Sequence, residues 1–414
     1  MNILLIHQYF LEKNDGGGSR FNEMTQVWSE MGHKITVISG MVHYNSGKKY
    51  EHCKGRFIHK QNDFYPNVDV VRSHVSESYN VNFLGRLWGY FSFVFSSMYA
   101  GIFKAKGKYD VVIVTSPPLF IGITGYILSR LKRLPLVFEV RDLWPESAID
   151  TGVISNKYII KFAYWFEKFI YKKSKVINVL TPAFKQKLIE SKGIPANKII
   201  FIPNAADFSL AEAISKDFNA ERFRKKLNLN DKFIITYVGA HGVANHLIQL
   251  IDVAEELQGT EIVFQLIGSG MQKPMLINEV AKRNLDNVIF VDPVPKKEVF
   301  KYILASDMGA SVLKKVDTFK TIYSNKTFDY MSCKKPILLA IDGVSRALVK
   351  EADCGFYVEP ENTKAIVEGV LMAIEHKDRL NDLGQNGYEF AKRHFDRNKL
   401  ASDYLNQINE KLAK

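Results

Sequence analysis

The stretch FIITYVGAHG, residues Phe233–Gly242, shows the pattern that decides the fold. Six mostly apolar residues lead directly into a loop with two glycines, and an amphipathic segment follows. A short apolar run that ends at a glycine favours a buried strand over a helix. Buried strands that alternate with amphipathic helices are typical of parallel sheets. The stretch therefore predicts an α/β fold.

The same alternation extends from this stretch towards both ends of the chain. Further strands are expected at Ile3–Ile6, Lys34–Ile38, Val68–Arg72, Val111–Thr115, Leu136–Val140, Val176–Leu180, Ile199–Ile202, Ile262–Ile267, Val288–Phe290, Met308–Val312 and Ile337–Ala340. Expected helices include Ser19–Met31, Pro118–Leu131, Lys157–Lys173, His246–Leu257, Met271–Arg283, Asn325–Ser332, Thr363–Ile374 and Lys399–Leu412. The pattern predicts two Rossmann-like, doubly wound domains whose strand-end loops face each other across a cleft.

A turn-rich segment, IPNAADFSL at Ile202–Leu210, marks the junction between the two domains. Pro203 and Asn204 end the preceding strand, and Asp207 can cap the helix that follows. We therefore predict one domain over residues 1–204 and a second over 205–395. The last segment, 396–414, is predicted to be a separate helix. A chain of 414 residues is long enough for two such domains.

Composition narrows the classes of function. Three cysteines without metal-ligand spacing predict reduced thiols and no metal site. The N-terminal sequence MNILLIHQYF does not resemble a signal peptide, which predicts a cytoplasmic protein. A net charge of +12 fits nucleic acid, an anionic bilayer or a phosphorylated substrate as partner. The sequence has no nucleic-acid-binding motif, so nucleic acid is not expected as a partner.

One uncharged segment, LWGYFSFVFSSMYAGIF at Leu87–Phe103, bears on the membrane. It is slightly short for a membrane span and contains three serines and two glycines. We expect a helix that is buried or faces the membrane, rather than one that crosses it. Lys104, Lys106 and Lys108 follow it and favour attachment to the inner face of the cytoplasmic membrane. Alternatively, the lysines only solvate the surface.

Two strand-end loops of the first half carry candidate site residues. Gly16, Gly17, Gly18 and Ser19 form a loop before a helix, where backbone N–H groups could bind a phosphate or an acceptor. This loop could also be only a flexible turn. The second loop follows the strand that ends at Val140 and carries two candidate catalytic residues.

Arg141 and Asp142 are the two candidate catalytic residues of this second loop. Arg141 can pair with a phosphate, and Asp142 can bind an acceptor hydroxyl or act as a base. The alternative is an ion pair between Arg141 and Glu146 that only holds the loop together.

The second half has glycine loops at the ends of its expected strands. Gly239, His241, Gly242 and Asn245 follow the first strand, and Gly268 follows the next. Such loops bring backbone N–H groups close to an anion. A later loop contains Val294 and could present backbone groups to a base, although a simple turn explains it equally well.

The segment that begins at Ser324 is the most informative. Ser324 or Asn325 can cap a helix, Lys326 can face a phosphate, and Asp329 can accept hydrogen bonds from two vicinal hydroxyls. Lys326 and Asp329 are three residues apart and therefore share one helix face. An ordinary salt bridge between them is the alternative.

These motifs, in this order, resemble the family 4 retaining glycosyltransferases, which have the GT-B fold. The resemblance rests on GGGSRFNEMTQVWSEMGHKITVIS, VFEVRDLWPES, IPNAADF, ITYVGAHG and SNKTFDYMSCKKPILLA. The DLWPES form resembles a bacterial subgroup that builds O-antigen, capsule and colanic-type polysaccharides, including WbuB-like N-acetylfucosaminyl transferases.

The resemblance implies roles for the two halves and for several residues. The N-terminal domain would bind the acceptor, the C-terminal domain the nucleotide sugar, and the last helix would return to the N-terminal domain. No metal or other cofactor would be needed. Asp329 would hold ribose hydroxyls, Arg141 and Asp142 would lie in the active-site loop, and Gly16 and Gly17 would lie near the diphosphate.

The sequence departs from the family pattern at three places. Thr321 replaces the usual first acidic residue, and His241 and Asn245 stand in the loop that usually carries an Arg…Lys pair. Arg141 replaces the usual active-site histidine. Other groups must therefore meet the charge of the leaving diphosphate, and Arg141, Lys326 and helix N-termini are the candidates.

The expected activity is transfer of a sugar from a UDP-sugar to a lipid-diphosphate-linked oligosaccharide in O-antigen or capsule synthesis. The resemblance favours an N-acetylated amino sugar such as L-FucNAc. Two alternatives remain: a non-catalytic GT-B scaffold subunit, favoured by the departures above, and a GT-B sugar-nucleotide epimerase, which would need a pair of carboxylates near the anomeric centre.

Overall fold

The computed structural model describes residues 1–13, 15, 20–43, 47–80, 83–150, 152 and 154–413. Gly16, Gly17, Gly18 and Ser19, predicted to form a phosphate or acceptor loop, lie outside the described residues. The chain divides into two compact units. The first contains Met1–Lys13, Ser19–Pro203 and Asn398–Lys414, and the second contains Asn204–Arg397.

The first unit is built on a sheet with the strand order β3-β4-β2-β1-β5-β6-β7-β8. All neighbouring strands are parallel except β3 and β4, which are antiparallel. The strands are β1 (Asn2–Ile6), β2 (Lys34–Gly40), β3 (Ile58–Tyr65), β4 (Val68–Ser73), β5 (Val111–Ser116), β6 (Leu136–Val140), β7 (Val176–Val179) and β8 (Ile199–Phe201).

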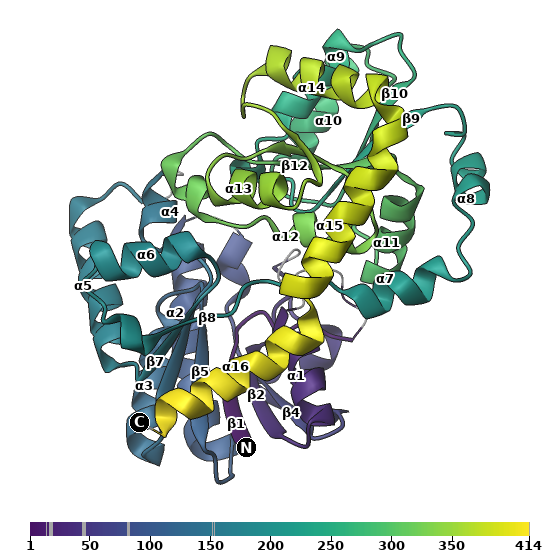
Figure 1. Cartoon of the computed structure of the whole chain (residues 1–414). Helices are drawn as coiled ribbons and strands as arrows, with labels where there is room; N and C mark the ends of the chain where they lie inside the picture. The colour runs from purple at the N-terminus through teal and green to yellow at the C-terminus, as the bar shows by residue number, and fades with distance from the viewer. Residues whose placement is uncertain are drawn as a thin grey trace. The chain divides into compact units, whose positions relative to one another are not determined.

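Helices follow most of these strands (Figure 1). They are α1 (Arg20–Glu30), α2 (Phe83–Tyr99), the π-helix η3 (Ala100–Lys104), α3 (Ile121–Lys132), α4 (Glu146–Asp150), α5 (Lys157–Lys173), α6 (Pro182–Glu190) and the last helix α16 (Arg397–Leu412). The indole N–H of Trp28 in α1 donates to the carbonyl oxygen of Ala401 in α16 at 2.8 Å. The ring of Tyr404 packs against that indole with centroids 5.6 Å apart, so α16 is held on the first unit by α1.

The second unit has a parallel sheet with the order β11-β10-β9-β12-β13-β14. Its strands are β9 (Phe233–Val238), β10 (Ile262–Ile267), β11 (Val288–Val291), β12 (Met308–Val312), β13 (Ile337–Ala340) and β14 (Gly355–Tyr357). Its helices are α7 (Phe208–Ser215), α8 (Ala220–Lys226), α9 (Ile248–Glu256), α10 (Lys273–Lys282), α11 (Lys296–Ala305), α12 (Asn325–Ser332), α13 (Val344–Glu351), α14 (Thr363–Glu375) and α15 (Leu380–His394).

The burial of the strands explains why these segments form sheets. Every residue of β5, β6, β10, β12 and β13 is buried. A parallel strand covered by helices on both faces carries a continuous apolar run, because neither face meets water. The two Rossmann-like α/β units that the sequence predicts are confirmed, and the boundary predicted after Asn204 lies one residue from the observed division between Pro203 and Asn204.

Two strands were not predicted, and both lie at the edge of a sheet. β3 has the sequence IHKQNDFY, and only one of its residues, Phe64, is fully buried. β14 is three residues long. Neither carries the apolar run by which the central strands are found, since an edge strand is covered less completely.

The uncharged segment 87–103 forms most of α2 and η3 (Figure 1). Phe93, Val94 and Ala100 are buried on its inner side, while Trp88 and Phe95 are 58 % and 60 % exposed. The segment is thus a helix with one buried and one exposed apolar side. Among the described residues, no helix combines the length and apolar character needed to cross a membrane.

Candidate functional site

The topology of the second unit points to the carboxyl ends of β9 and β12. The strand order reverses between these neighbours, because β10 and β11 extend the sheet on one side and β13 and β14 on the other. Open α/β sheets bind ligands outside the carboxyl ends of their strands at this reversal. Gly239 follows β9 directly, and α12 is packed against β12.

Two glycine loops lie against each other at this edge. Gly239 and Gly268 have φ of 142° and 141°, values that residues with a Cβ rarely adopt. A Cβ on Gly268 would overlap the carbonyl oxygen of Gly239, and one on Gly270 would overlap the carbonyl oxygen of His241. The N–H of His241 donates to the carbonyl of Ser269 at 2.9 Å. Only glycine therefore permits this close packing of the predicted loops.

His241 is fully buried between these loops. In the described part of the chain neither ring nitrogen has a partner at full hydrogen-bond distance and angle, and the backbone of Ile267 comes near enough to oppose the lowering of its pKa. Burial, reinforced by the nearby charge of Lys273, lowers the pKa of His241 to about 4, so the ring is neutral at pH 7. A neutral imidazole carries one N–H that can donate to a ligand oxygen. Buried polar atoms without partners are uncommon and indicate a place for a ligand or water.

Helix α12 is fixed to the sheet by Tyr330. Its hydroxyl oxygen lies 3.0 Å from the carbonyl oxygens of both Thr236 and Ala310, which share its one hydrogen, and accepts from the N–H of Val238 at 3.2 Å. A Cβ on Gly309 would overlap the Tyr330 ring, so that glycine makes room for it. The start of α12 is thereby held beside the end of β9.

This position brings Lys326 to the first glycine loop. Its Cε lies 3.4 Å from the place of a Cβ on Gly239, and its Nζ lies 4.8 Å from the centre of the Tyr237 ring. The ammonium also lies 3.4 Å from the hydroxyl of Ser324, which itself accepts from Ser311 at 2.8 Å. Ser324 occupies the N-cap position of α12 without making the predicted side-chain cap.

Burial lowers the pKa of Lys326 to about 8, against the opposing effect of Asp329. The predicted alternative of an ordinary salt bridge between these two residues does not describe the contacts, since the ammonium is directed to Tyr237 and Ser324. A desolvated ammonium beside a glycine loop interacts strongly with an anion, because the surroundings screen it poorly.

Asp329 lies one helical turn after Lys326 and belongs to a second charged group. Burial raises its pKa to about 6; Lys296 lowers that pKa and Asp207 raises it. Lys296 and Asp207 form an ion pair at 2.7 Å, and Asp207 also accepts from the N–H of Leu210 at the start of α7, as predicted. Sequence reasoning missed the Lys296–Asp207 pair, because its members are 89 residues apart.

The remaining predicted residues of the second unit lie around these loops. Gly242 precedes the 3-10 helix Val243–Asn245, and the Asn245 amide lies close to Gly242. Asn325 is exposed at the start of α12. Val294 is half-buried in the loop after β11. Gly239, His241, Gly268 and Lys326 are therefore the predicted residues that the structure brings together.

The carboxyl edge of the first unit is organised around a buried carboxylate. Glu139 in β6 accepts from Arg20 at 3.1 and 3.3 Å and from the amide of Asn178 at 2.9 Å. Arg20 also donates to the carbonyl oxygens of Ile202 and Pro203, where the chain leaves this unit. Neither Glu139 nor Asn178 was expected to matter, because both stand within apolar strands.

The predicted residues Arg141 and Asp142 follow that carboxylate. Arg141 lies 4.0 Å from Glu139, and Glu146 pairs with Lys192 at 2.8 Å. Asp142 accepts from the hydroxyl of Ser147 at 2.7 Å. Burial raises the pKa of Asp142, and this hydrogen bond lowers it. Asp142 therefore helps to hold its own loop.

His7 is a further buried polar residue at this edge. It follows β1, and its Nδ1 lies 2.7 Å from the hydroxyl of Thr115 in β5, across the point where the strand order reverses. Burial lowers the pKa of His7, and Arg141, Arg20 and Arg72 lower it further. The only sequence signal for His7 was its position as a polar residue directly after a predicted strand.

Comparison with known protein families decides the classification. Residues 15–205 match the Glycosyl transferase 4-like domain, and residues 219–390 match the Glycosyl transferases group 1 domain. The chain belongs to the family 4 glycosyltransferases of the GT-B fold. This confirms the resemblance on which the sequence interpretation rested, while the WbuB-like subgroup stays a prediction.

Related proteins cover the whole length of this glycosyltransferase. The putative colanic acid biosynthesis glycosyl transferase WcaI of Escherichia coli K12 is 22 % identical over 99 % of this chain and 100 % of its own. Sucrose-phosphate synthase from Thermosynechococcus elongatus has a TM-score of 0.75 at 16 % identity, over 100 % of this chain and 99 % of its own. Anabaena HepE in complex with UDP-glucose has a TM-score of 0.71 at 16 % identity, over 99 % of this chain and 100 % of its own.

Proposed function

We propose that this glycosyltransferase transfers a sugar from a UDP-sugar to a lipid-diphosphate-linked oligosaccharide, with retention of configuration. The observation that carries the proposal is the group of His241, Lys326 and the Gly239 and Gly268 loops at the carboxyl edge of the second sheet. Similarity to WcaI, described as a putative colanic acid biosynthesis enzyme, and to HepE in complex with UDP-glucose supports this choice of pathway and donor.

The groups at this edge are proposed to stabilise the diphosphate as it leaves the sugar. Glycosyl transfer leaves negative charge on the phosphate oxygen as the bond to the sugar breaks, and donors aimed at that charge lower the barrier. In the proposal the ammonium of Lys326, the N–H of neutral His241 and the backbone N–H groups of the glycine loops bind the diphosphate. Asp329 accepts from the ribose hydroxyls. This chemistry uses no metal ion or other cofactor.

The first unit is proposed to hold the acceptor. Arg141 would bind a phosphate or sugar oxygen, and Asp142 would bind the attacking hydroxyl. An N-acetylated amino sugar such as L-FucNAc is the proposed group transferred, from the resemblance of the DLWPES segment to O-antigen and capsule enzymes.

A panel of UDP- and GDP-sugars tests the activity. We expect release of UDP from one of the UDP-sugars by the purified chain, and slower release from every GDP-sugar. UDP-glucose and UDP-N-acetylated sugars belong in the panel. Absence of turnover together with absence of nucleotide binding would contradict the proposal.

A non-catalytic scaffold is the second candidate. Thr321, at the position of the usual acidic residue, donates its hydroxyl to the carbonyl of Thr318 at 2.6 Å and supplies no carboxylate. Asp329→Ala and Arg141→Ala separate the two candidates. An enzyme loses polymer production in both variants, whereas a scaffold keeps production near the wild-type level.

The proposed place of action is the inner face of the cytoplasmic membrane. Trp88, Phe95 and Phe103 expose apolar surface on α2 and η3, and Trp165 does so on α5, where it is 60 % exposed. Helix α3 packs against both α2 and α5. Exposed aromatic side chains flanked by lysines are typical of helices that lie on anionic bilayers.

Liposome sedimentation tests this attachment. The variant W88S/F95S/W165S is expected to lose binding to anionic vesicles, and F91S is a poor probe because Phe91 packs on Phe120 at 5.0 Å. A triple variant that binds like the wild type would show that these residues do not face the bilayer.

A further inference from the structure

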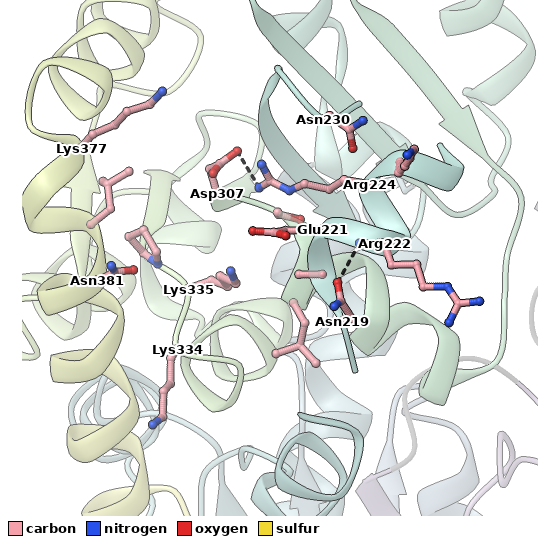
Figure 2. Close-up of a pocket in the computed structure, with 16 residues that line it drawn as sticks. Asn219, Glu221, Arg222, Arg224, Asn230, Asp307, Lys334, Lys335, Lys377 and Asn381 are labelled. Carbon is pink, nitrogen blue, oxygen red and sulfur yellow. Dashed lines mark hydrogen bonds and ion pairs between the residues drawn. The ribbon is translucent and has the colours of Figure 1, made fainter. Parts of the chain in front are cut away.

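The second unit has a large cavity at the edge of the sheet opposite to the donor loops (Figure 2). It encloses about 910 Å³, within the usual range for sites of small molecules. Ser306 and Asp307 line it directly before β12, and Lys335 and Pro336 directly before β13. Strands of four or five residues span about 15 Å, so this cavity is separate from the glycine loops at their carboxyl ends.

Positive charge dominates the lining. Its cationic residues outnumber its carboxylates, which are Glu221 and Asp307. The cationic residues are Arg222, Arg224, Lys225, Lys334, Lys335 and Lys377. Most clusters of this kind on a protein surface alternate in sign, since like charges that share one cavity repel each other. Arg224 is paired with Asp307, and Arg222 and Lys334 point away from the cavity (Figure 2), so Lys225, Lys335 and Lys377 against Glu221 are the charges that favour an anion as the occupant.

The carboxylate of Asp307 is already engaged. It pairs with Arg224 at 2.9 Å and accepts from the N–H of Ile234 at 2.7 Å. Arg224 is fixed further by a hydrogen bond of 2.6 Å from its Nε to the carbonyl of Ala305. One of the two carboxylates is therefore used to hold the wall of the cavity.

Lys335 is the residue of the lining that most favours an anion in the cavity. Burial lowers its pKa, Asp307 raises it, and Arg224 lowers it further. Its ammonium has no carboxylate within 4.0 Å among the described residues, whereas exposed lysines of the same unit, such as Lys301, make such pairs. A partly buried ammonium whose neighbouring carboxylate, Asp307, is already paired with Arg224 gains from a ligand that brings negative charge.

The close-up view shows how the side chains lie. Lys335 and Asn381 point into the space between α8 and α15, whereas Lys334 and Arg222 point away from it (Figure 2). Lys377 holds its ammonium 5.4 Å from the Phe233 ring at the rim. The amide of Asn381, in the same lining, adds a donor and an acceptor, so phosphate oxygens and hydroxyls can both be bound.

We propose that this cavity binds a small phosphate-bearing anion, with Lys335 as the principal cation and Asn381 as a second contact. Glu221 is exposed, and its carboxylate lies in the same space as Lys335 (Figure 2), so its negative charge opposes binding of an anion. The site is independent of the nucleotide-sugar proposal, because it uses no residue of the glycine loops or of α12.

Calorimetric titration of the full chain tests the site. Inorganic pyrophosphate and glucose 1-phosphate are the probes, and saturating UDP is present throughout to fill the donor site. We expect Lys335→Met to weaken binding at least tenfold, since a hydrogen bond to a charged group is worth that much or more. Glu221→Gln is expected to tighten binding about threefold or more, which misfolding cannot mimic.

Lys282→Met is the matched control, because Lys282 is an exposed lysine of the same unit that does not line the cavity. The affinity of Lys282→Met for both probes is expected to equal that of the wild type. Tighter binding of the sugar phosphate than of pyrophosphate would identify an organic phosphate as the ligand, and the reverse order an inorganic one. Absence of binding under saturating UDP, or equal affinity in the wild type, Lys335→Met and Glu221→Gln, would overturn the proposal.

Discussion

The carboxyl edges of the two sheets differ in what their polar groups contact. In the first unit Arg20, Glu139 and Asn178 satisfy one another, and Asp142 is held by Ser147. In the second unit His241 has two buried ring nitrogens without a partner at full hydrogen-bond distance and angle among the described residues. The first edge thus contains a group of charged and polar residues, Arg20, Glu139 and Asn178, that stabilises the fold, whereas the second contains a buried ring that can bind a ligand. Substitutions in the Arg20–Glu139–Asn178 group should affect stability, and those in the glycine loops and at Lys326 should affect UDP binding.

The largest effect is expected from Arg20→Met. Loss of one member of a buried ion pair leaves Glu139 without its partner and lowers the free energy of unfolding by about 3–5 kcal/mol. Chemical denaturation measures the change. The double variant R20M/E139Q should recover part of it, because no uncompensated charge remains. A native-like stability of Arg20→Met would show that this edge is not held by the pair.

Gly268→Ala should act on binding. The added Cβ overlaps the carbonyl oxygen of Gly239 and is strained at φ of 141°, so the two loops must move apart. Overpacking of this kind costs about 1–3 kcal/mol, and if the whole cost falls on the UDP-binding conformation, UDP affinity drops by about fivefold to 150-fold. Gly259→Ala is the control, because its φ is also positive at 78° but no atom lies near its Cβ position. Equal UDP affinity in both variants would contradict the assignment of the loop.

The pH dependence of UDP binding should show two limbs. The pKa of Lys326 is about 8, so its ammonium loses its charge, and affinity falls, as the pH rises through 8. The pKa of Asp329 is about 6, so the carboxylate is protonated and accepts more weakly as the pH falls through 6. Lys326→Met should remove the alkaline limb, and Asp329→Asn the acidic one. Bound diphosphate shifts the alkaline limb upward, since the anion favours the ammonium.

Ser147→Ala is expected to have the smallest effect. It removes one hydrogen bond to Asp142, worth about 1 kcal/mol, and raises the pKa of that carboxyl further. Thermal unfolding should detect the loss, while UDP affinity stays unchanged. A clear loss of UDP affinity in this variant would mean that the two edges do not have separate roles.

Much of the fold could be predicted from sequence, for reasons that specific elements show. The predicted bounds of β6, β9, β10, β12 and β13 agree with the structure, because a strand buried on both faces is a largely apolar run. β3 was missed because residues such as His59 and Lys60 face partly outward on an edge strand.

The site was predictable only in part. The glycine loops follow strands directly, and α12 begins with polar residues typical of a helix start, so local sequence reveals them. The contact of Lys326 with Tyr237 and the influence of Lys296 on Asp329 depend on which helices the sheet brings together. The role of Glu139 could not be predicted from local sequence. It depends on the contact of Glu139 with Arg20, which lies 119 residues away in the chain.

Calorimetric titration of UDP into the wild type and into Lys326→Met tests the central claim most directly. Lys320→Met is the control, because Lys320 is an exposed lysine near the same helix that pairs with Asp317 at 2.8 Å. Loss of a charge-assisted contact with the diphosphate predicts UDP affinity lower by about tenfold to a hundredfold in Lys326→Met and unchanged affinity in Lys320→Met. Equal UDP affinity in all three proteins would contradict the placement of the nucleotide at the carboxyl edge of the second sheet.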